Sequence, residues 1–401
     1  MQTTPGKPSD TYSPLYFLVS LGAGGLAVTF FMWLMHWISL HPSRPVPVFE
    51  DIVLAFAAGG ISMRFMIIAA VAGVALCGFL NIKYLVWNLI QYRSWKQTEA
   101  FAQLRTSNAE TQLMAMPLAM AMSVNVCFVF GMVFVPGLWS VVEYLFPLAL
   151  LAFLAIGVLA LGQLGGFLGR VLTLGGFSCA ANNSFAQAMP AFALAMIGVG
   201  LAAPAGMSAN HVVAGTGLVF STFFLVAAVL IGAVALVLGF RSLIENGANI
   251  ETAPTLSIFI PLLTIIGILS LRQGHGLNEH FALASSGADR LMLLSQFFSA
   301  QLLFALLTGL VLARLGYIRR FILGREISVG SYALICPGVA LAVMLHFWLN
   351  RGMVDAGLIV KFSPVYWMIS LVAVALQFAT MWLVFRLNRR HFGTPSGTNK
   401  L

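Results

Sequence analysis

Four cysteines are the residues of this sequence best suited to covalent or redox chemistry, and none belongs to a CxxC pair. They are Cys77, Cys127, Cys179 and Cys336, and each lies in or beside an apolar segment. Zinc sites and disulfide frameworks need clustered or regularly spaced cysteines, so we predict neither. Cys336 directly precedes Pro337. Two interpretations stay open for its thiol: a redox or pore-gating group, or a small buried hydrophobic residue.

The motifs of cofactor and nucleotide chemistry are absent from the sequence. It contains no GxxxxGK[ST] loop, which cradles phosphates, and no GxGxxG following a strand. The histidines closest to apolar segments, His36, His211 and His346, stand at scattered segment ends. Haem ligation needs histidines that face one another at one depth. We therefore predict no cofactor, no metal and no enzymatic activity.

The composition indicates what type of element carries these cysteines and histidines. Of 401 residues, 60% are hydrophobic and 8% are charged, and the mean hydropathy is +0.94. A soluble domain carries about 25% charged residues. These values exclude a soluble globular protein, a disordered chain and a nucleic-acid-binding protein, and they favour a helical protein in the lipid bilayer. Apolar segments long enough to span are expected at residues 14–38, 63–90, 114–136, 139–165, 185–205, 211–240, 254–272, 289–315, 328–350 and 363–386.

Basic residues between these segments predict the orientation. With both termini on the cytoplasmic side, the inner segments hold 15 of the 21 lysines and arginines and the outer segments hold 6. Such asymmetry is typical of the positive-inside rule. We expect a bacterial inner-membrane protein with a cytoplasmic N-terminal tail (1–13), a transmembrane domain (14–386) and a cytoplasmic basic tail (387–401). The first loop (39–62) is expanded, and its apolar piece 52–61 is too short to span, which predicts an interfacial or re-entrant segment. The first span is expected to act as an uncleaved insertion signal.

Prolines recur in the odd-numbered spans. Pro117, Pro190, Pro261 and Pro337 are separated by 73, 71 and 76 residues. This spacing predicts five quasi-repeated two-helix hairpins. A proline inside a spanning helix kinks it and frees a carbonyl, which lipid does not tolerate. We therefore expect the odd helices to be inner and kinked at these prolines, and the even helices to be outer. Gly22 lies in the middle of the first span, where it serves close packing or leaves room in a pore.

The odd spans are almost free of charge but not of polar groups. Hydroxyl and amide side chains occur at Ser20, Thr29, Ser123, Asn125, Asn182, Asn183, Ser257, Thr264 and Ser331. A corridor of neutral polar groups with basic mouths passes anions without binding them tightly. Without carboxylates in the odd spans there is no proton relay along them, so coupled active transport is not expected.

Three blocks of the sequence resemble one known family. They are 16–25 (YFLVSLGAGG), 253–261 (APTLSIFIP) and 331–337 (SYALICP). Together with ten spans and proline-bearing odd helices, they resemble the tellurite-resistance/dicarboxylate transporter family, which includes the plant slow-type anion channel. The resemblance implies a homotrimer with one pore per subunit and passage of dicarboxylates, sulfite, nitrate or chloride.

The resemblance also implies a pore closed by a phenylalanine in the ninth span. The matching position here is Cys336 or, one turn earlier, Tyr332, and no phenylalanine occurs in that block. The other residues expected to constrict the pore are Phe17, Phe128, Phe192 and Phe259. Two alternatives to the anion channel stay open: a membrane thiol-redox protein that uses Cys336 with Cys127 or Cys179, and a scaffold or sensor subunit without flux.

Overall fold

The chain is all-helical, and ten of its helices are long and apolar enough to cross a membrane. The computed structural model describes residues 12–41, 44–180, 182–281 and 286–392, and these ranges contain no β-strand. In chain order the ten candidate spans are Pro14–Trp37, Ile61–Trp95, Asn108–Phe134, Leu138–Leu174, Ala186–Met207, His211–Asn246, Ala253–Phe281, Gly287–Arg314, Val329–Val354 and Pro364–Phe392. The prediction of an all-α protein with ten such helices is confirmed.

Each even-numbered span is a single long α-helix, whereas each odd-numbered span begins with a 3-10 segment. The even spans are α3 (Ile61–Trp95), α6 (Leu138–Leu174), α8 (His211–Asn246), α10 (Gly287–Arg314) and α12 (Pro364–Phe392). The odd spans are η1 (Pro14–Tyr16) with α1 (Phe17–Trp37), η2 (Asn108–Met114) with α5 (Ala115–Phe134), η3 (Ala186–Ala188) with α7 (Met189–Met207), η4 (Ala253–Ile258) with α9 (Phe259–Phe281), and η6 (Val329–Leu334) with α11 (Ile335–Phe347).

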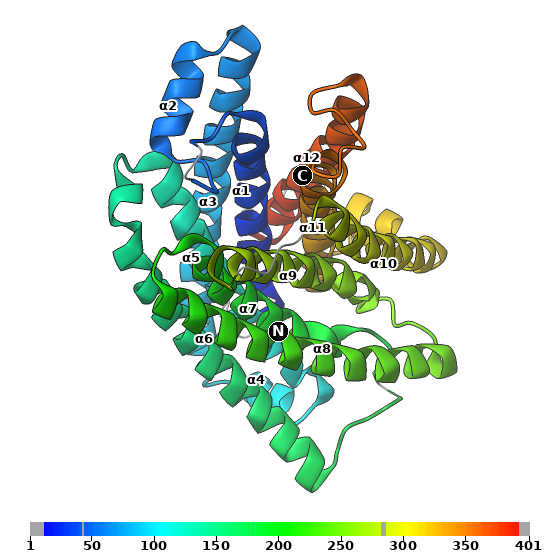
Figure 1. The fold of residues 1–401 in the computed structure, drawn as a ribbon. Coiled ribbons are helices and arrows are strands. Elements are labelled where there is room, and N and C mark those ends of the chain that lie inside the picture. Colours follow the sequence, from blue (N-terminus) through cyan, green and yellow to red (C-terminus); the bar gives the residue numbers. More distant parts are fainter. Residues whose placement is uncertain (1–11, 42–43, 181, 282–285, 393–401) are drawn as a thin grey trace.

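The five 3-10 segments lie together at one end of the molecule. Each of them contacts the next in chain order, and η6 contacts η1, so that they form a closed ring. We call this end the 3-10 end. The five α-helices that follow close in the same way, because α1 contacts both α5 and α11, and α7 lies between α5 and α9. Figure 1 shows the same closure in its colours, with dark-blue α1 beside α11 and α12.

The recurring prolines lie where the 3-10 segments pass into α-helix. Pro190 is the second residue of its α-helix, and Pro117, Pro261 and Pro337 are each the third. The first turn of an α-helix tolerates proline because its N–H groups have no partner within the helix. We expected kinks inside the spans. The structure instead places these prolines at the change of helix type.

Odd and even spans differ in burial. In their most apolar stretch the odd spans are 67–94% buried within the chain, whereas the even spans are 17–39% buried. Each odd span packs against the even span that follows it, as α7 does against α8. The even spans therefore shield the odd spans and present the apolar outer surface.

Amide side chains of the even spans satisfy carbonyls of the odd spans near the 3-10 end. Asn81 of α3 donates to the carbonyl of Ser20 (2.8 Å), and Gln301 of α10 donates to the carbonyl of Ile260 (2.9 Å). Both amides are fully buried. An unpaired carbonyl in an apolar interior is costly, so these bonds stabilise the irregular starts of the odd spans.

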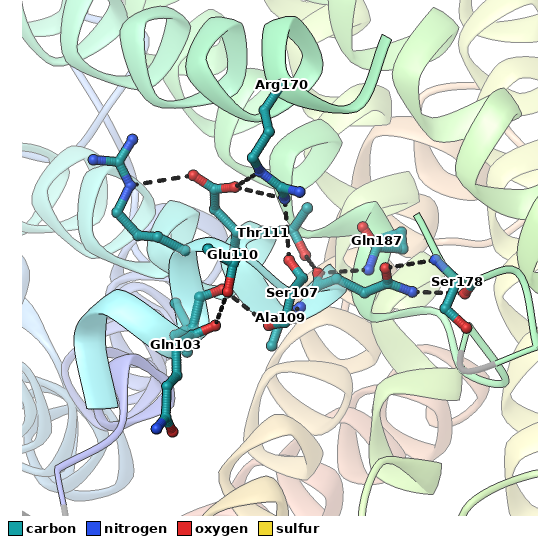
Figure 2. A network of polar contacts seen from close by, with 12 residues as sticks. Gln103, Ser107, Ala109, Glu110, Thr111, Arg170, Ser178 and Gln187 are labelled. Atoms are coloured by element: carbon teal, nitrogen blue, oxygen red, sulfur yellow. Dashed lines mark hydrogen bonds and ion pairs between the residues drawn. The ribbon is translucent and has the colours of Figure 1, made fainter. Parts of the chain in front are cut away.

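A polar network also links the helices at the 3-10 end (Figure 2). The buried carboxylate of Glu110 in η2 accepts two hydrogen bonds from Arg170 of α6, at 2.9 and 3.1 Å. Arg105 of the short helix α4 (Glu99–Arg105) approaches the same carboxylate at 3.4 Å. Gln187 of η3 donates to the carbonyl of Asn108 (2.9 Å). The network thus joins the beginnings of the third and fifth spans to the end of the fourth.

Several predicted boundaries shift in the structure. The helix of the seventh span, α9, continues to Phe281 rather than ending at residue 272. It does so through a polar stretch that hydropathy does not assign to a span. The short apolar piece of the first loop is a separate helix, α2 (Phe49–Ala58), outside the candidate spans. The basic tail expected from residue 387 is helical to Phe392, and Arg390 donates to the carbonyl of Phe321 (2.6 Å) within η5 (Ile318–Leu323). Residues 1–11 and 393–401 of the predicted tails lie outside the described residues.

Candidate functional site

A large cavity lies among the odd spans. Its volume is about 930 Å³, and its wall comes mainly from α1, α5, α7, α9 and α11, with contributions from the first halves of α6 and α10. The lining extends to Met207 at the end of α7 and to Glu279 near the end of α9. The cavity therefore reaches the end of the molecule opposite the 3-10 end, which we call the open end.

The cavity ends at a neck of three residues. Phe192 of α7, Pro261 of α9 and Cys336 of α11 line both this cavity and a second, much smaller pocket of about 20 Å³. The small pocket lies toward the 3-10 end, between residues such as Leu15 of η1 and Thr255 of η4. Phe192 and Cys336 are only 3% and 7% exposed. The large cavity is thus closed from the 3-10 end by side chains at the neck.

The residues that the sequence suggested as pore-lining divide into two groups. Gly22, Phe128, Phe192 and Cys336 line the large cavity. Gly22 also packs closely against Ile335, since a Cβ atom added at Gly22 would overlap the Ile335 side chain. Both roles considered for this glycine, packing and leaving room, are therefore present at one position.

The second group lies away from the cavity, in packed aromatic contacts. The Phe259 ring stacks on Phe304 of α10 with centroids 4.9 Å apart. The Phe17 ring meets Tyr92 of α3 edge-on. The Tyr332 hydroxyl donates to Asn388 of α12 (3.1 Å), and its side chain is fully buried. These three rings pack odd spans against even spans near the 3-10 end.

Between the neck and the level of Arg272, the described part of the cavity wall carries no charged side chain and is mostly apolar. Two predicted neutral polar residues, Asn125 and Thr264, line it. Thr264 donates to the carbonyl of Ala340 (3.1 Å), which ties α9 to α11. The rest of this wall is rich in methionine, a flexible and polarisable side chain: Met32, Met35, Met122, Met132, Met196 and Met207.

Charged groups collect toward the open end, where arginine predominates. The lining contains four arginines (Arg44, Arg272, Arg290 and Arg351) and two carboxylates, those of Glu279 and Asp289. Among the lining residues alone, arginines therefore exceed carboxylates by two. Basic groups that line a cavity raise the local concentration of anions.

Three of these arginines have carboxylate partners. Arg44 lies 3.6 Å from Asp51 of α2, and Arg290 lies 3.1 Å from Asp355. Arg351 belongs to the π-helical end of the ninth span (η7, Trp348–Val354). It lies 3.9 Å from the same Asp355. Their charges are therefore partly neutralised at the mouth.

Arg272 differs from the other three. Its only hydrogen bond among the described residues goes to the carbonyl of Val199 (2.7 Å), and no carboxylate of the described chain pairs with it. The sequence count of basic residues placed Arg272 among the six of the outer segments, at the last residue of the expected span 254–272. The signal that would have placed it inside is the helix-compatible sequence that follows, 273–281.

The cysteines do not gather at the site. All four are free thiols, and of the four only Cys336 lines the large cavity. Cys127 and Cys179 are exposed. The part of the chain that the structure describes contains no group of three or more histidine, cysteine or acidic residues that could hold a metal.

Two of the histidines that appeared scattered in the sequence meet in the structure. The rings of His36 in α1 and His346 in α11 stack with centroids 6.2 Å apart, and both are buried. They lie beside Trp37 rather than in the cavity lining.

Comparison with known proteins adds no assignment, since no protein-family model and no curated protein matches this chain.

Proposed function

We propose that the chain is a facilitative transporter or channel for small anions, with its path through the ring of odd spans. The observation that carries this proposal is the large cavity, which reaches the open end and stops at the neck of Phe192, Pro261 and Cys336. A second pocket beyond the neck continues in the direction of the 3-10 end. A path that is wide on one side and blocked by a few side chains corresponds to a closed pore.

The electrostatics favour anions over cations. The cavity lining has four arginines against two carboxylates, and the wall toward the neck has none of either. Anions would be concentrated at the basic end and then pass a neutral, weakly interacting wall. The absence of carboxylates from that wall among the described residues provides no proton relay, which supports passive rather than coupled movement.

Phe192 is the proposed gate. It is the bulkiest of the three neck residues, and it comes from the fifth span, not from the ninth as the family resemblance would imply. Rotation of its ring would join the two pockets without moving the backbone. The resembling family places its phenylalanine at the position of Cys336 or, one turn earlier, of Tyr332, and of these two only Cys336 lines the neck.

We further propose that the chain is built from five quasi-repeated hairpins and belongs with the tellurite-resistance/dicarboxylate transporters. Five proline-marked 3-10 starts, closed rings of odd spans and the segregation of burial between odd and even spans support this. On the same basis we propose a homotrimer in a bacterial inner membrane with the 3-10 end at the cytoplasm. The basic residues that flank that end favour this orientation.

Flux through reconstituted protein tests the function. Purified protein in liposomes is exposed to a voltage step with chloride, nitrate, sulfite or malate as the permeant anion. We expect low anion flux for the wild type and a flux at least about tenfold higher for Phe192→Ala, which removes the neck ring. Phe128→Ala is the matched control, because Phe128 lines the cavity but not the neck. If neither the wild type nor Phe192→Ala passes any anion above empty liposomes, the proposed function is wrong.

A further inference from the structure

We infer that Arg272 is an anion-binding residue inside the cavity and that it selects oxyanions over halides. This inference deepens the proposed function, on which it rests for the identity of the solute as an anion. It starts from the position of one guanidinium group in the lining of the large cavity.

The Arg272 side chain lies deep inside the cavity. Its guanidinium bonds to the carbonyl of Val199, which precedes Met207, the last residue of α7, by eight residues. At 1.5 Å per residue this places the guanidinium about 12 Å inside the open end of α7. Phe192 lies seven residues further toward the 3-10 end, so the group stands about 10 Å before the neck. Side chains of a helix point toward its N-terminus, and Arg272 accordingly extends from α9 toward the neck.

The charge of Arg272 is not compensated by the protein around it. An arginine has five N–H donors, and the described residues supply a single acceptor, the Val199 carbonyl. Ala203 and Ile268, which stand one helical turn from Val199 and Arg272 along their helices, also line the cavity. A half-buried guanidinium in an apolar wall is unfavourable unless an anion pairs with it. The other lining arginines (Arg44, Arg290 and Arg351) each have a carboxylate within 4 Å and do not have this requirement.

The geometry of the free donors indicates which anions fit. A guanidinium presents parallel N–H groups that match two oxygens of one planar oxyanion, such as nitrate or a carboxylate. A spherical halide accepts from the same fork without this bidentate match. The Val199 carbonyl occupies one donor at Nη1 and holds the group in place. The structure thus assigns to Arg272 the binding of one nitrate-like or carboxylate oxygen pair between mouth and neck.

Exchange of chloride for nitrate tests the inference without any flux measurement. The thermal unfolding midpoint of the detergent-purified protein is measured while nitrate replaces chloride at constant total anion concentration. A ligand that binds the native state raises this midpoint. We expect the wild-type midpoint to rise with the nitrate fraction. In Arg272→Gln the affinity for nitrate should fall about 10- to 100-fold, the range expected for loss of hydrogen bonds to a charged group.

Two further variants separate charge, fork geometry and folding. Arg272→Lys keeps the charge without the fork, and we expect it to bind both anions with no preference for nitrate. Arg44→Gln removes an arginine that is already paired at the mouth, and it should keep the wild-type nitrate response. The midpoints of all variants in chloride alone report any loss of folding.

The outcomes distinguish this inference from the proposed function. A wild-type midpoint that does not respond to nitrate, or an Arg272→Gln protein that responds as the wild type does, overturns the inference. Nitrate binding that depends on Arg272 in a protein without liposome flux would uphold the inference and reject the channel. Liposome flux whose nitrate-to-chloride ratio is unchanged in Arg272→Gln would uphold the channel and reject the inference.

Discussion

Phe192 and Cys336 come from different helices, α7 and α11, and together they separate the large cavity from the small pocket behind it. Cys336 is 7% exposed, and its thiol is therefore poorly reached from the cavity while the Phe192 ring is in place. The pair gives the neck a bulky aromatic ring on one side and a small thiol on the other. The rate at which a reagent modifies the Cys336 thiol therefore reports whether the Phe192 ring covers it.

Removal of the Phe192 ring should expose Cys336 to reagents that enter from the open end. The test uses a protein in which the other three cysteines are replaced by alanine, so that Cys336 is the single thiol. A charged, membrane-impermeant thiosulfonate should modify Phe192→Ala at least about tenfold faster than its Phe192 parent, which corresponds to a barrier lowered by about 1.4 kcal/mol. Mass spectrometry measures the rate. Equal rates in the two proteins would mean that Phe192 does not cover the thiol.

Gly22 should tolerate no side chain, because α1 packs against α11 beside the neck. A methyl group at position 22 would overlap Ile335. Overpacking of this kind costs about 1–3 kcal/mol, so Gly22→Ala should lower the thermal unfolding midpoint. Ile335→Ala in the same chain should restore part of the loss by making room.

Gly162 provides the control for that substitution. It lies within α6, and nothing stands within 4 Å of a Cβ atom added there. Alanine in a helix interior is favoured over glycine by about 0.5–1 kcal/mol, so Gly162→Ala should leave the midpoint unchanged or raise it. A Gly22→Ala protein as stable as Gly162→Ala would contradict the close packing of α1 on α11.

The sequence predicted the number and type of the spans because the length of an apolar run can be read along the sequence without knowledge of packing. It also pointed to Gly22, Phe128, Phe192 and Cys336 as residues along a path, and the structure places all four in the cavity lining. It did not separate them from Phe259 and Tyr332, which are similar in type and in position along their spans. Packing against neighbouring helices determines which face of a uniformly apolar helix points inward. The sequence of such a helix has no hydrophobic periodicity that would identify this face.

Two other features could not be derived from the sequence for a related reason. The prolines indicated irregular backbone in the odd spans, but only the structure shows that the irregularity is a 3-10 start shared by all five. Arg272 was counted among outer basic residues because hydropathy assigns a charged residue to a loop. Its helix continues beyond it, and the residue lines the cavity.

The network around Glu110 should contribute strongly to stability at the 3-10 end. Its carboxylate is 4% exposed and is held by two arginines, Arg170 and Arg105. Replacing one partner of a buried ion pair leaves the other charge uncompensated and costs about 3–5 kcal/mol. Because Arg170 is partly exposed, we expect the lower end of that range for Glu110→Gln, measured as a lowered unfolding midpoint.

An exposed ion pair supplies the comparison. Glu245 lies 3.0 Å from Arg241 on the surface of α8, with both side chains more than half exposed. Surface pairs contribute about 0–1 kcal/mol, so Glu245→Gln should change the midpoint little. Equal effects of the two substitutions would show that the Glu110 network does not fasten the beginnings of the third and fifth spans.

Acid should release α2 from the loop that joins α5 to α6. The Glu50 carboxylate accepts a hydrogen bond from the backbone N–H of Gly137 (2.6 Å). This bond, with a further contribution from Arg44, lowers the pKa of Glu50 below its ordinary value. A carboxylate whose pKa is lowered by folding stabilises the folded state above the ordinary carboxyl pKa of about 4.3. That stabilisation is lost as the pH falls through the lowered pKa.

Hydrogen exchange of residues 49–58, corrected for intrinsic rates, measures this release. In the wild type we expect protection at neutral pH that declines as the pH falls below the ordinary carboxyl pKa and through the lowered pKa of Glu50. Glu50→Gln removes the charge at every pH, so its exchange should be faster at neutral pH and should show no further acid-dependent loss. The change will be modest, because Glu50 is exposed and solvent weakens its interactions. If acid loosens the wild type and Glu50→Gln in parallel, another group must control the attachment of α2.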